Sequence, residues 1–331
     1  MELAVAVGQI AVMDFADEAA GLSAHECFAA GMAIFSEVNS SAQLDRAIAL
    51  IEAASEQGVA DATEKLALFE AIGIARPSNW AGALDKLRLA AAQGSAGAQG
   101  QLLVLARMAP SRGQPDWKSV RDNINLERLV GSGERQTLSE SPRVRVIRGF
   151  ATPAECGWLI DHARPRLKSA MIYDREGNEV VDPSRTNRST EFQIPDMDLV
   201  IEIIRSRISR ALRIPLAAFE LTQFLHYQPG QEFRLHHDYL DPSNPEHRKH
   251  LDTHGQRIAT FLIYLNEQFE GGETDFPKAG VRFRGKTGDA IFWANVGPDG
   301  GPDLASVHTG RPPLSGEKWI LSQWVRDRAS A

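Results

Sequence analysis

The sequence predicts an α+β protein in which an all-α region of helical repeats precedes a β-rich region. Up to about residue 130, alanine, leucine and glutamate dominate, and one pattern recurs at a regular spacing. After residue 143, short apolar segments are separated by glycine, proline and aspartate, which is typical of the short strands of a sandwich or barrel. We therefore expect a helical domain over 1–130, a linker over 131–142 and a β-rich domain over 143–331.

The helical region contains an internal repeat. ASEQGVADATEKL (54–66) aligns with AAAQGSAGAQGQL (90–102) at a spacing of 36 residues. RPSNWAGALDKL (76–87) and RGQPDWKSVRDNI (112–124) each place a proline, a capping Asn or Asp and a tryptophan at a helix start. The pattern predicts paired helices of the tetratricopeptide kind and resembles the Sel1-like subclass. Two roles stay open: a concave surface for a peptide or protein partner, or a helical cap on the following domain.

The composition predicts a soluble globular chain. Its 331 residues, 43% of them hydrophobic, can bury a full core. The formal net charge of -7 argues against a nucleic-acid binder, which needs a basic face to displace counterions. No apolar stretch approaches the roughly 20 residues that span a bilayer, and the run MELAVAVGQI lacks the basic leader of a signal peptide. Cys27 and Cys156 lie far apart, so we expect no disulfide framework. Together with the lack of a long apolar stretch, this predicts no membrane association and a cytoplasmic location.

The elements after residue 131 are predicted from local patterns. GSGERQTLSESPR (131–143) is rich in glycine and serine and predicts an exposed connection. RVRVIRGF (143–150) alternates with period two, as in a half-buried strand. Thr152 is the expected N-cap of a helix that has Pro153 at its first position. Further strands are expected at SAMIYD (169–174), STEFQI (189–194), LTQFLHYQ (221–228), RIATFLIYLN (257–266), DAIFWAN (289–295) and KWILSQWV (318–325).

The stretch RLHHDYLDP (234–242) carries the first chemical signal. Side chains alternate along a strand, so His236 and Asp238 should project to one face and His237 to the other. With the distant His308, they make a set of two histidines and one carboxylate, which suits Fe(II) and leaves open coordination positions. His308 is expected near the start of a hairpin whose turn is PPLSG (312–316). For the stretch alone, the alternative is a solvated surface run.

Lys318 supplies a matching cation. It is expected on the strand that returns after His308, where it could bind the distal carboxylate of a 2-oxo acid that chelates the metal. A lone lysine in a strand is more often a solvated edge residue. Its position between Gly316 and the apolar run WILSQW favours the pocket instead.

From about residue 143 to 328, the chain resembles the prolyl 4-hydroxylase-like 2-oxoglutarate- and Fe(II)-dependent dioxygenases. The motifs YQPGQEFRLHHD, RIATFLIYLNEQFEGGETDFP, GDAIFW and HTGRPPLSGEKWILSQWVRD follow the order of that family. The resemblance implies a double-stranded β-helix (jelly-roll) core and a need for Fe(II), 2-oxoglutarate and O2, with ascorbate as an optional cofactor. It implies these site residues: the Fe(II) ligands His236, Asp238 and His308, the 2-oxoglutarate carboxylate partner Lys318, and the pocket tyrosines Tyr227 and Tyr264.

Four residues are candidates to face the substrate. Arg257 occupies a position that often does so in the family, and Arg185 and Arg188 of RTNRST (185–190) could meet a substrate carboxylate. Phe233 stands where many members have a tyrosine, so a hydroxyl is missing near the expected substrate pocket.

The resemblance implies a hydroxylase of an unactivated C–H, and its substrate stays open. The first prediction is a prolyl residue of a peptide or protein, with the repeats as a docking aid. The alternatives are a free amino acid or a carrier-bound natural-product intermediate, and a jelly-roll binding protein without turnover. The intact triad and Lys318 argue against the last. Three further histidines, His247, His250 and His254, are expected in a solvated polar loop or lid, not in a second metal site.

Overall fold

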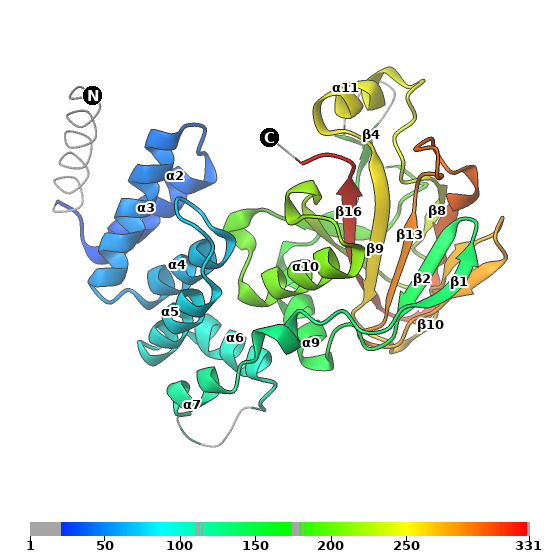
Figure 1. Cartoon of the computed structure of the whole chain (residues 1–331). Helices are drawn as coiled ribbons and strands as arrows, with labels where there is room; N and C mark the ends of the chain where they lie inside the picture. The colour runs from blue at the N-terminus through cyan, green and yellow to red at the C-terminus, as the bar shows by residue number, and fades with distance from the viewer. Residues whose placement is uncertain (1–20, 110–112, 114, 174–178, 181, 330–331) are drawn as a thin grey trace. The chain divides into compact units, whose positions relative to one another are not determined.

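The computed structural model describes residues 21–109, 113, 115–173, 179–180 and 182–329 (Figure 1). The expectation about a signal peptide concerns MELAVAVGQI, which lies outside these residues. Two compact units are present. The first comprises the described residues up to Leu126 together with Ile194–Glu202, and the second comprises Glu127–Gln193 and the chain from Ile203 onward. Among the described residues, no helix combines the length and the apolar character needed to cross a bilayer.

The first unit is helical, and its local signals follow the sequence pattern. Asn79 and Asp116 are the N-caps of their helices and place Trp80 and Trp117 at the first helical positions, as the repeat predicts. Its helices are α2 (Ala24–Ser36), α3 (Ser41–Glu56), α4 (Ala60–Ile72), α5 (Trp80–Ala92), α6 (Ala96–Ala106) and α7 (Trp117–Asp122). Successive helices are in contact: α2 with α3, α3 with α4, α4 with α5 and α5 with α6. The paired helical repeat and its Sel1-like assignment stay predictions.

The first unit also holds a segment from far along the sequence, Ile194–Glu202, which contains the short helix η2 (Ile194–Asp196). Lys65 Nζ donates hydrogen bonds to the carbonyl oxygens of Pro195 at 2.8 Å and Met197 at 3.2 Å. Gln101 Oε1 accepts one from the main-chain N–H of Leu199 at 2.9 Å. The helices therefore contact the main chain of this segment.

The second unit contains two main antiparallel sheets. The large sheet has the order β1 (Gln136–Glu140), β2 (Arg143–Ile147), β13 (Ala290–Ala294), β9 (Arg257–Tyr264), β16 (Lys318–Arg326), β7 (Thr222–Tyr227), β6 (Arg188–Phe192) and β3 (Lys168–Ser169). The small sheet has the order β12 (Val281–Phe283), β11 (Thr274–Phe276), β14 (His308–Gly310) and β8 (Phe233–His236). The second unit also contains two separate two-stranded sheets: β10 (Phe269–Gly271) with β15 (Pro313–Gly316), and β4 (Ile172–Tyr173) with β5 (Glu179–Val180). This arrangement agrees with the expected jelly-roll class.

The core of the second unit combines side chains of both sheets. Leu225, Tyr264 and Ile320 come from the large sheet, and Phe276 and Phe283 come from the small one. All are at most 7% exposed, so the inner faces of the two sheets share one apolar core. The functional site lies at this inner surface.

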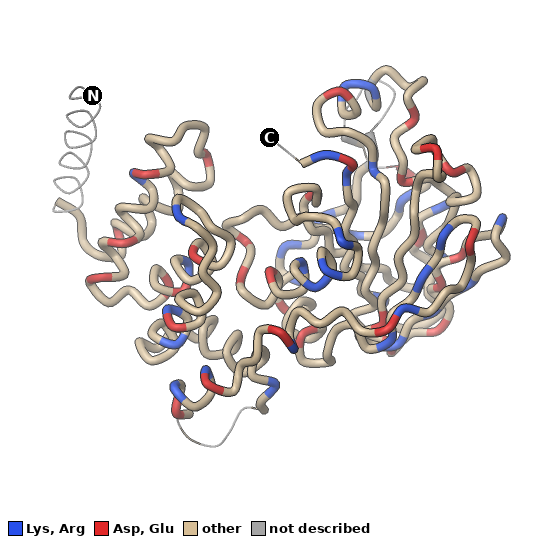
Figure 2. Tube along the Cα trace, viewed as in Figure 1, with Lys and Arg blue, Asp and Glu red and all other residues tan. Residues whose placement is uncertain are grey.

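Helices connect the strands of the second unit. α9 (Pro153–Ala163) begins as predicted, because Thr152 and Glu155 form a capping box. Figure 2 shows several arginines along α10 (Leu199–Leu212). One of them, Arg207, is 2% exposed; it bonds to Glu155 at 2.7 Å and to the carbonyl oxygens of Leu129 and Phe150, both at 2.6 Å. The remaining short helices are α8 (Leu126–Leu129), η1 (Arg164–Arg166), η3 (Leu216–Ala218) and η4 (Leu304–Ser306).

Three local expectations differ from the structure. Residues 136–140, expected in a linker, form strand β1, which pairs with β2 and packs Leu138 against the core. The turn expected at PPLSG is strand β15, which pairs with β10. The polar loop expected around His247 forms α11 (Pro245–His254), because Pro245 suits a first helical position and good helix formers follow it. Cys27 and Cys156 are buried thiols.

Candidate functional site

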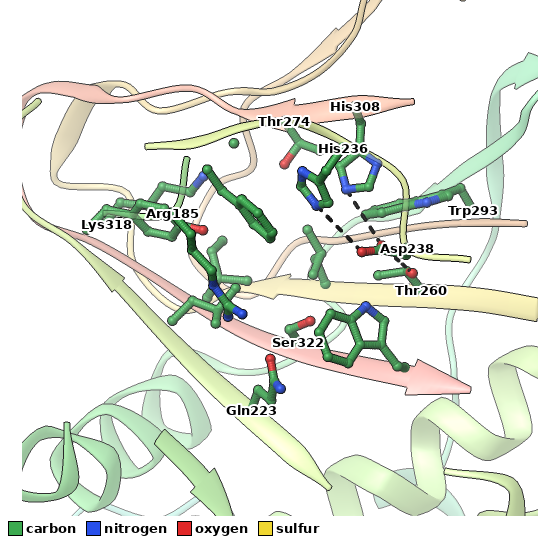
Figure 3. Close-up of a pocket in the computed structure, with 17 residues that line it drawn as sticks. Arg185, Gln223, His236, Asp238, Thr260, Thr274, Trp293, His308, Lys318 and Ser322 are labelled. Atoms are coloured by element: carbon green, nitrogen blue, oxygen red, sulfur yellow. Dashed lines mark hydrogen bonds and ion pairs between the residues drawn. The ribbon is translucent and has the colours of Figure 1, made fainter. Parts of the chain in front are cut away.

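A pocket opens on the inner face of the large sheet (Figure 3). Its floor is made of alternate residues on three neighbouring strands, since side chains two apart share one face of a strand. These residues are Gln223, Leu225 and Tyr227 on β7, Thr260 and Leu262 on β9, and Lys318, Ile320, Ser322 and Trp324 on β16. The small sheet adds Phe233, His236, Thr274, His308 and Gly310.

The predicted ligands meet at one end of the pocket. One ligand atom from each of His236, Asp238 and His308 lies within 4.8 Å of the others. The Nε2 atom of His236 is 3.5 Å from Asp238 Oδ1, and that of His308 is 3.6 Å from Asp238 Oδ2. Strands β8 and β14 pair His236 directly with His308, which places the two rings side by side. Two imidazole nitrogens and a carboxylate oxygen at this spacing fit a single divalent metal ion.

Hydrogen bonds hold both histidines in the ligand form. His236 Nδ1 is 2.7 Å from the carbonyl oxygen of Arg234, and His308 Nδ1 is 3.0 Å from that of Ser306. A carbonyl oxygen can only accept, so each ring carries its proton on Nδ1 and presents the Nε2 lone pair to the site. Burial also lowers the pKa of His308 to about 4, which keeps that ring neutral at physiological pH.

The carboxylate reaches the site by a bend. Strand β8 ends at His236, and Asp238 lies in the bend after it. The alternation of side chains along a strand, which was expected to include Asp238, therefore stops before this residue. The predicted faces are nevertheless observed: Asp238 lines the pocket, and His237 does not but lies beside Tyr239. Burial alone would raise the pKa of Asp238, but the interactions with His308 and His236 lower it by a larger amount. The net pKa lies below its usual value, so the carboxyl is ionised.

The other end of the pocket contains a buried ammonium group. Lys318 is 2% exposed, and its Nζ lies 4.8 Å from the ring centre of Tyr227 and 5.5 Å from that of Tyr264. Burial lowers the pKa of Lys318 to about 7, and the charge of Glu273 opposes this shift. In the described part of the chain, no carboxylate bonds to Lys318. The site therefore fits an anionic ligand. His308 and Lys318 lie on different sheets, not on the expected hairpin.

The two predicted tyrosines have different positions. Tyr227 lines the pocket, opposite Lys318 in the strand register, and burial raises its pKa to about 12. Tyr264 lies behind the lining. Its hydroxyl donates to the carbonyl oxygen of Phe283 at 3.0 Å and contacts Thr274 Oγ1 at 2.9 Å. Thr274 reaches the pocket in its place, and it was not among the residues predicted from the sequence.

Of the four candidate substrate residues, two line the pocket. Arg185 is 7% exposed and lies over the Phe233 ring, with Cζ 4.9 Å from the ring centre. Phe233 stacks in turn on His236, with ring centres 3.5 Å apart. Main-chain hydrogen bonds on both sides of Arg185, from Arg234 N to Ser184 O and from Thr186 N to Glu232 O, hold its segment beside β8.

The other two candidates lie outside the lining. Arg188 is exposed and donates to the carbonyl oxygen of Leu167 at 2.7 Å. Arg257 forms an ion pair with Glu220, at 2.6 and 2.8 Å, and its Cζ lies 3.6 Å from the ring centre of Trp324. Arg257 therefore lies outside the pocket lining and contacts the lining residue Trp324.

Several pocket residues were not predicted from the sequence. Gln223, Thr260 and Ser322 are polar residues at inward positions of strands, and the period-two pattern of each strand was a signal that could have identified them. The histidines of α11 do not gather within metal-binding distance, as far as the described residues show.

Comparisons with known proteins agree with this site. Residues 222–326 match the model of the 2OG-Fe(II) oxygenase superfamily. Prolyl 4-hydroxylase 1 of Arabidopsis thaliana is 35% identical over 231 residues, which cover 65% of this chain and 79% of the relative. Prolyl 4-hydroxylase 5 of the same plant is 36% identical over 217 residues, covering 59% and 72%.

Among solved structures, the viral collagen prolyl hydroxylase of Paramecium bursaria Chlorella virus-1, in complex with 2-oxoglutarate, is similar at 29% identity. The match covers 57% of this chain and 98% of that one, with a TM-score of 0.44. The sequence relatives decide the assignment: the chain belongs to the prolyl 4-hydroxylase-like family of 2-oxoglutarate- and Fe(II)-dependent dioxygenases, and is a hydroxylase that uses Fe(II), 2-oxoglutarate and O2.

Proposed function

We propose that this enzyme hydroxylates a C–H bond of a prolyl residue in a peptide or protein. The observation that carries the proposal is one pocket that combines the His236, Asp238 and His308 cluster with the buried ammonium of Lys318. Relatives named prolyl 4-hydroxylases support the substrate class. When bound, Fe(II) and 2-oxoglutarate activate O2, which places one oxygen atom in the C–H bond while 2-oxoglutarate becomes succinate and CO2.

In this proposal each residue of the chain has a defined task. His236, Asp238 and His308 hold Fe(II), and the two histidines are kept in the ligand tautomer by carbonyl oxygens. Lys318 binds the C5 carboxylate of 2-oxoglutarate. Tyr227 contacts the same end of the pocket.

The remaining contacts are indirect or face the substrate. Tyr264 acts through Thr274, since its own hydroxyl is bonded inside the core. Arg185 and Phe233 face the substrate, while Arg257 positions Trp324. Arg188 does not line the pocket and is dropped from this role.

A free amino acid or a carrier-bound intermediate is the alternative substrate, and a jelly-roll binding protein without turnover is the remote one. The buried Arg185 supports the first alternative, because it could bind the carboxylate of a free amino acid. Succinate release should be measured with proline-containing peptides, free proline and other free amino acids, with mass spectrometry to detect the added oxygen. Turnover of peptides alone supports the proposal, turnover of free amino acids alone contradicts it, and no turnover of any kind favours the binding protein.

We further propose that the helical unit binds the segment Ile194–Glu202 of the same chain and does not bind the substrate. The hydrogen bonds of Lys65 and Gln101 to Pro195, Met197 and Leu199 support this role, because these two side chains already have main-chain partners. A protein partner at the repeats is the second candidate. A cytoplasmic location and the use of ascorbate stay predictions.

A further inference from the structure

A chain of two hydrogen bonds leads from the metal-binding carboxylate into the large sheet. Thr260 Oγ1 donates to Asp238 Oδ2 at 2.6 Å, and Asn295 Nδ2 donates to Thr260 Oγ1 at 2.9 Å. The three side chains belong to residues that are 4%, 1% and 0% exposed, in the order Asp238, Thr260 and Asn295. Thr260 lies on β9, and Asn295 directly follows β13, the neighbouring strand. Solvent therefore does not compete for these bonds.

The direction of both bonds follows from the number of protons. The ionised carboxylate of Asp238 can only accept, so the single hydroxyl proton of Thr260 points to Oδ2. The same hydroxyl then has only lone pairs left for Asn295, which must present its NH2 group. If the amide were turned, its oxygen would compete with Asp238 for that one proton.

Asn295 is itself held at both ends of its main chain. Its N–H donates to the carbonyl oxygen of Ile258 at 2.9 Å, and its carbonyl oxygen accepts from the N–H of Asp303 at 3.0 Å. The backbone of Asn295 is therefore anchored, and its side-chain NH2 group bonds to Thr260, while Oδ1 has no hydrogen-bond partner among the described residues. The NH2 group can fix the hydroxyl of Thr260, and through it the plane of the Asp238 carboxylate, before any metal binds.

We propose that Asn295 is a positioning residue for the metal centre and acts through Thr260 on Asp238. The inference rests on the proposed Fe(II) site. Partners of a ligating carboxylate orient it, and their loss typically weakens metal binding by about 10- to 100-fold. Nothing in the linear pattern marks Asn295, which lies 57 positions after Asp238 and does not itself line the pocket.

The test is the affinity of the full-length protein for Co(II) without 2-oxoglutarate, together with the visible absorption spectrum of bound Co(II). Thr260→Val should weaken Co(II) binding by about 10-fold or more and change the spectrum, because the shape is kept and the donor is lost. Asn295→Leu should weaken it in the same direction. Thr260→Ser keeps the hydroxyl and should retain most of the affinity.

A double variant tests whether Asn295 acts through Thr260. If it does, adding Asn295→Leu to Thr260→Val should cause no further loss of Co(II) affinity, since the connecting hydroxyl is already absent. Losses that add up in the double variant would contradict this connection. Co(II) affinities of both single variants within about twofold of the wild type would overturn the proposal, given the 10-fold loss expected.

Thr222→Val is the matched control. Thr222 is fully buried in the same sheet and also pairs with a side-chain amide, donating to Gln323 Oε1 at 2.7 Å, but it does not line the pocket. It should lower the melting temperature without changing Co(II) affinity. If Thr260→Val does not fold, Asn295→Leu and Thr260→Ser still decide the question, through the rise in melting temperature that Co(II) causes. A wild-type protein that binds neither Co(II) nor Fe(II) would contradict the proposed function itself.

Discussion

The helical unit and the pocket of the second unit both contain buried or half-buried polar side chains, but the partners of these side chains differ. In the helical unit, Lys65 and Gln101 bond to the main chain of Ile194–Glu202. In the pocket, Lys318 is buried without a bonded carboxylate among the described residues, and Arg185 Nε lacks an acceptor there. A buried polar group without a partner costs folding free energy, so the unpartnered groups in the pocket lining favour binding of a ligand there. This difference supports ligand binding in the pocket and is consistent with our proposal that the helices bind a segment of their own chain.

The largest effect is expected at the metal centre. His236→Ala, Asp238→Ala and His308→Ala should each abolish Fe(II)-dependent succinate release, because a ligand of the ion is lost. His237→Ala is the matched control, since its ring lies beside Tyr239 outside the pocket lining and Fe(II) affinity should stay nearly unchanged. Anaerobic Fe(II) titration of the four variants measures this. Loss of Fe(II) binding in the His237 variant alone would overturn the face assignment.

The next effect is expected at the buried ammonium. Lys318→Met should raise the KM for 2-oxoglutarate strongly, because the removal of one member of a buried charge pair costs roughly 2 to 5 kcal/mol. The exposed Lys286 of the same unit offers a control, and Lys286→Met should leave that KM unchanged. An unaltered dependence on 2-oxoglutarate in the Lys318 variant would mean that another cation binds the carboxylate.

A smaller effect concerns pH. Burial holds the pKa of Lys318 at about 7, and the groups that face its Nζ are the Tyr227 and Tyr264 rings, with Glu273 nearby. Above pH 7 the amine is therefore mostly neutral, and a carboxylate must bind together with a proton. The dissociation constant of 2-oxoglutarate should then rise about 10-fold per pH unit above this pKa.

Calorimetry with the metal-loaded enzyme, over a range of pH, measures this dependence. Lys318→Arg provides the control, because a guanidinium stays charged throughout, so the slope should disappear even if binding is weaker. A wild-type affinity that does not change with pH would show that Lys318 is already protonated in the ligand-free pocket.

The smallest effect is expected in the helical unit. Gln101→Leu leaves the Leu199 N–H without its acceptor, which should lower the free energy of unfolding by about 1 to 3 kcal/mol and speed hydrogen exchange at that amide. The KM for a peptide substrate should not change if the helices hold only their own chain. Gln99→Leu on the same helix is the control, since its amide bonds to Ala91 O within the repeats. A raised peptide KM with normal stability would favour substrate docking by the repeats.

Local patterns account for the parts of the molecule that the sequence predicted correctly. Helix caps at Asn79, Asp116 and Thr152 are encoded within a few residues, and so is the period-two pattern of the long strands. The motif around His236 and Asp238, with His308 and Lys318, carried enough chemistry to predict the site.

The tertiary structure decided how these pieces meet. The pairing of β8 with β14 places His308 opposite His236, while β16 places Lys318 on the other sheet, and neither partner can be read from a local pattern. The sequence alone also missed Asn295, because its contact with Thr260 depends on the packing of two neighbouring strands. Periodicity and capping signals reflect interactions between residues that are close to one another in the sequence. Contacts between distant segments are selected by burial and hydrogen bonding in the folded core, so only the folded structure reveals them.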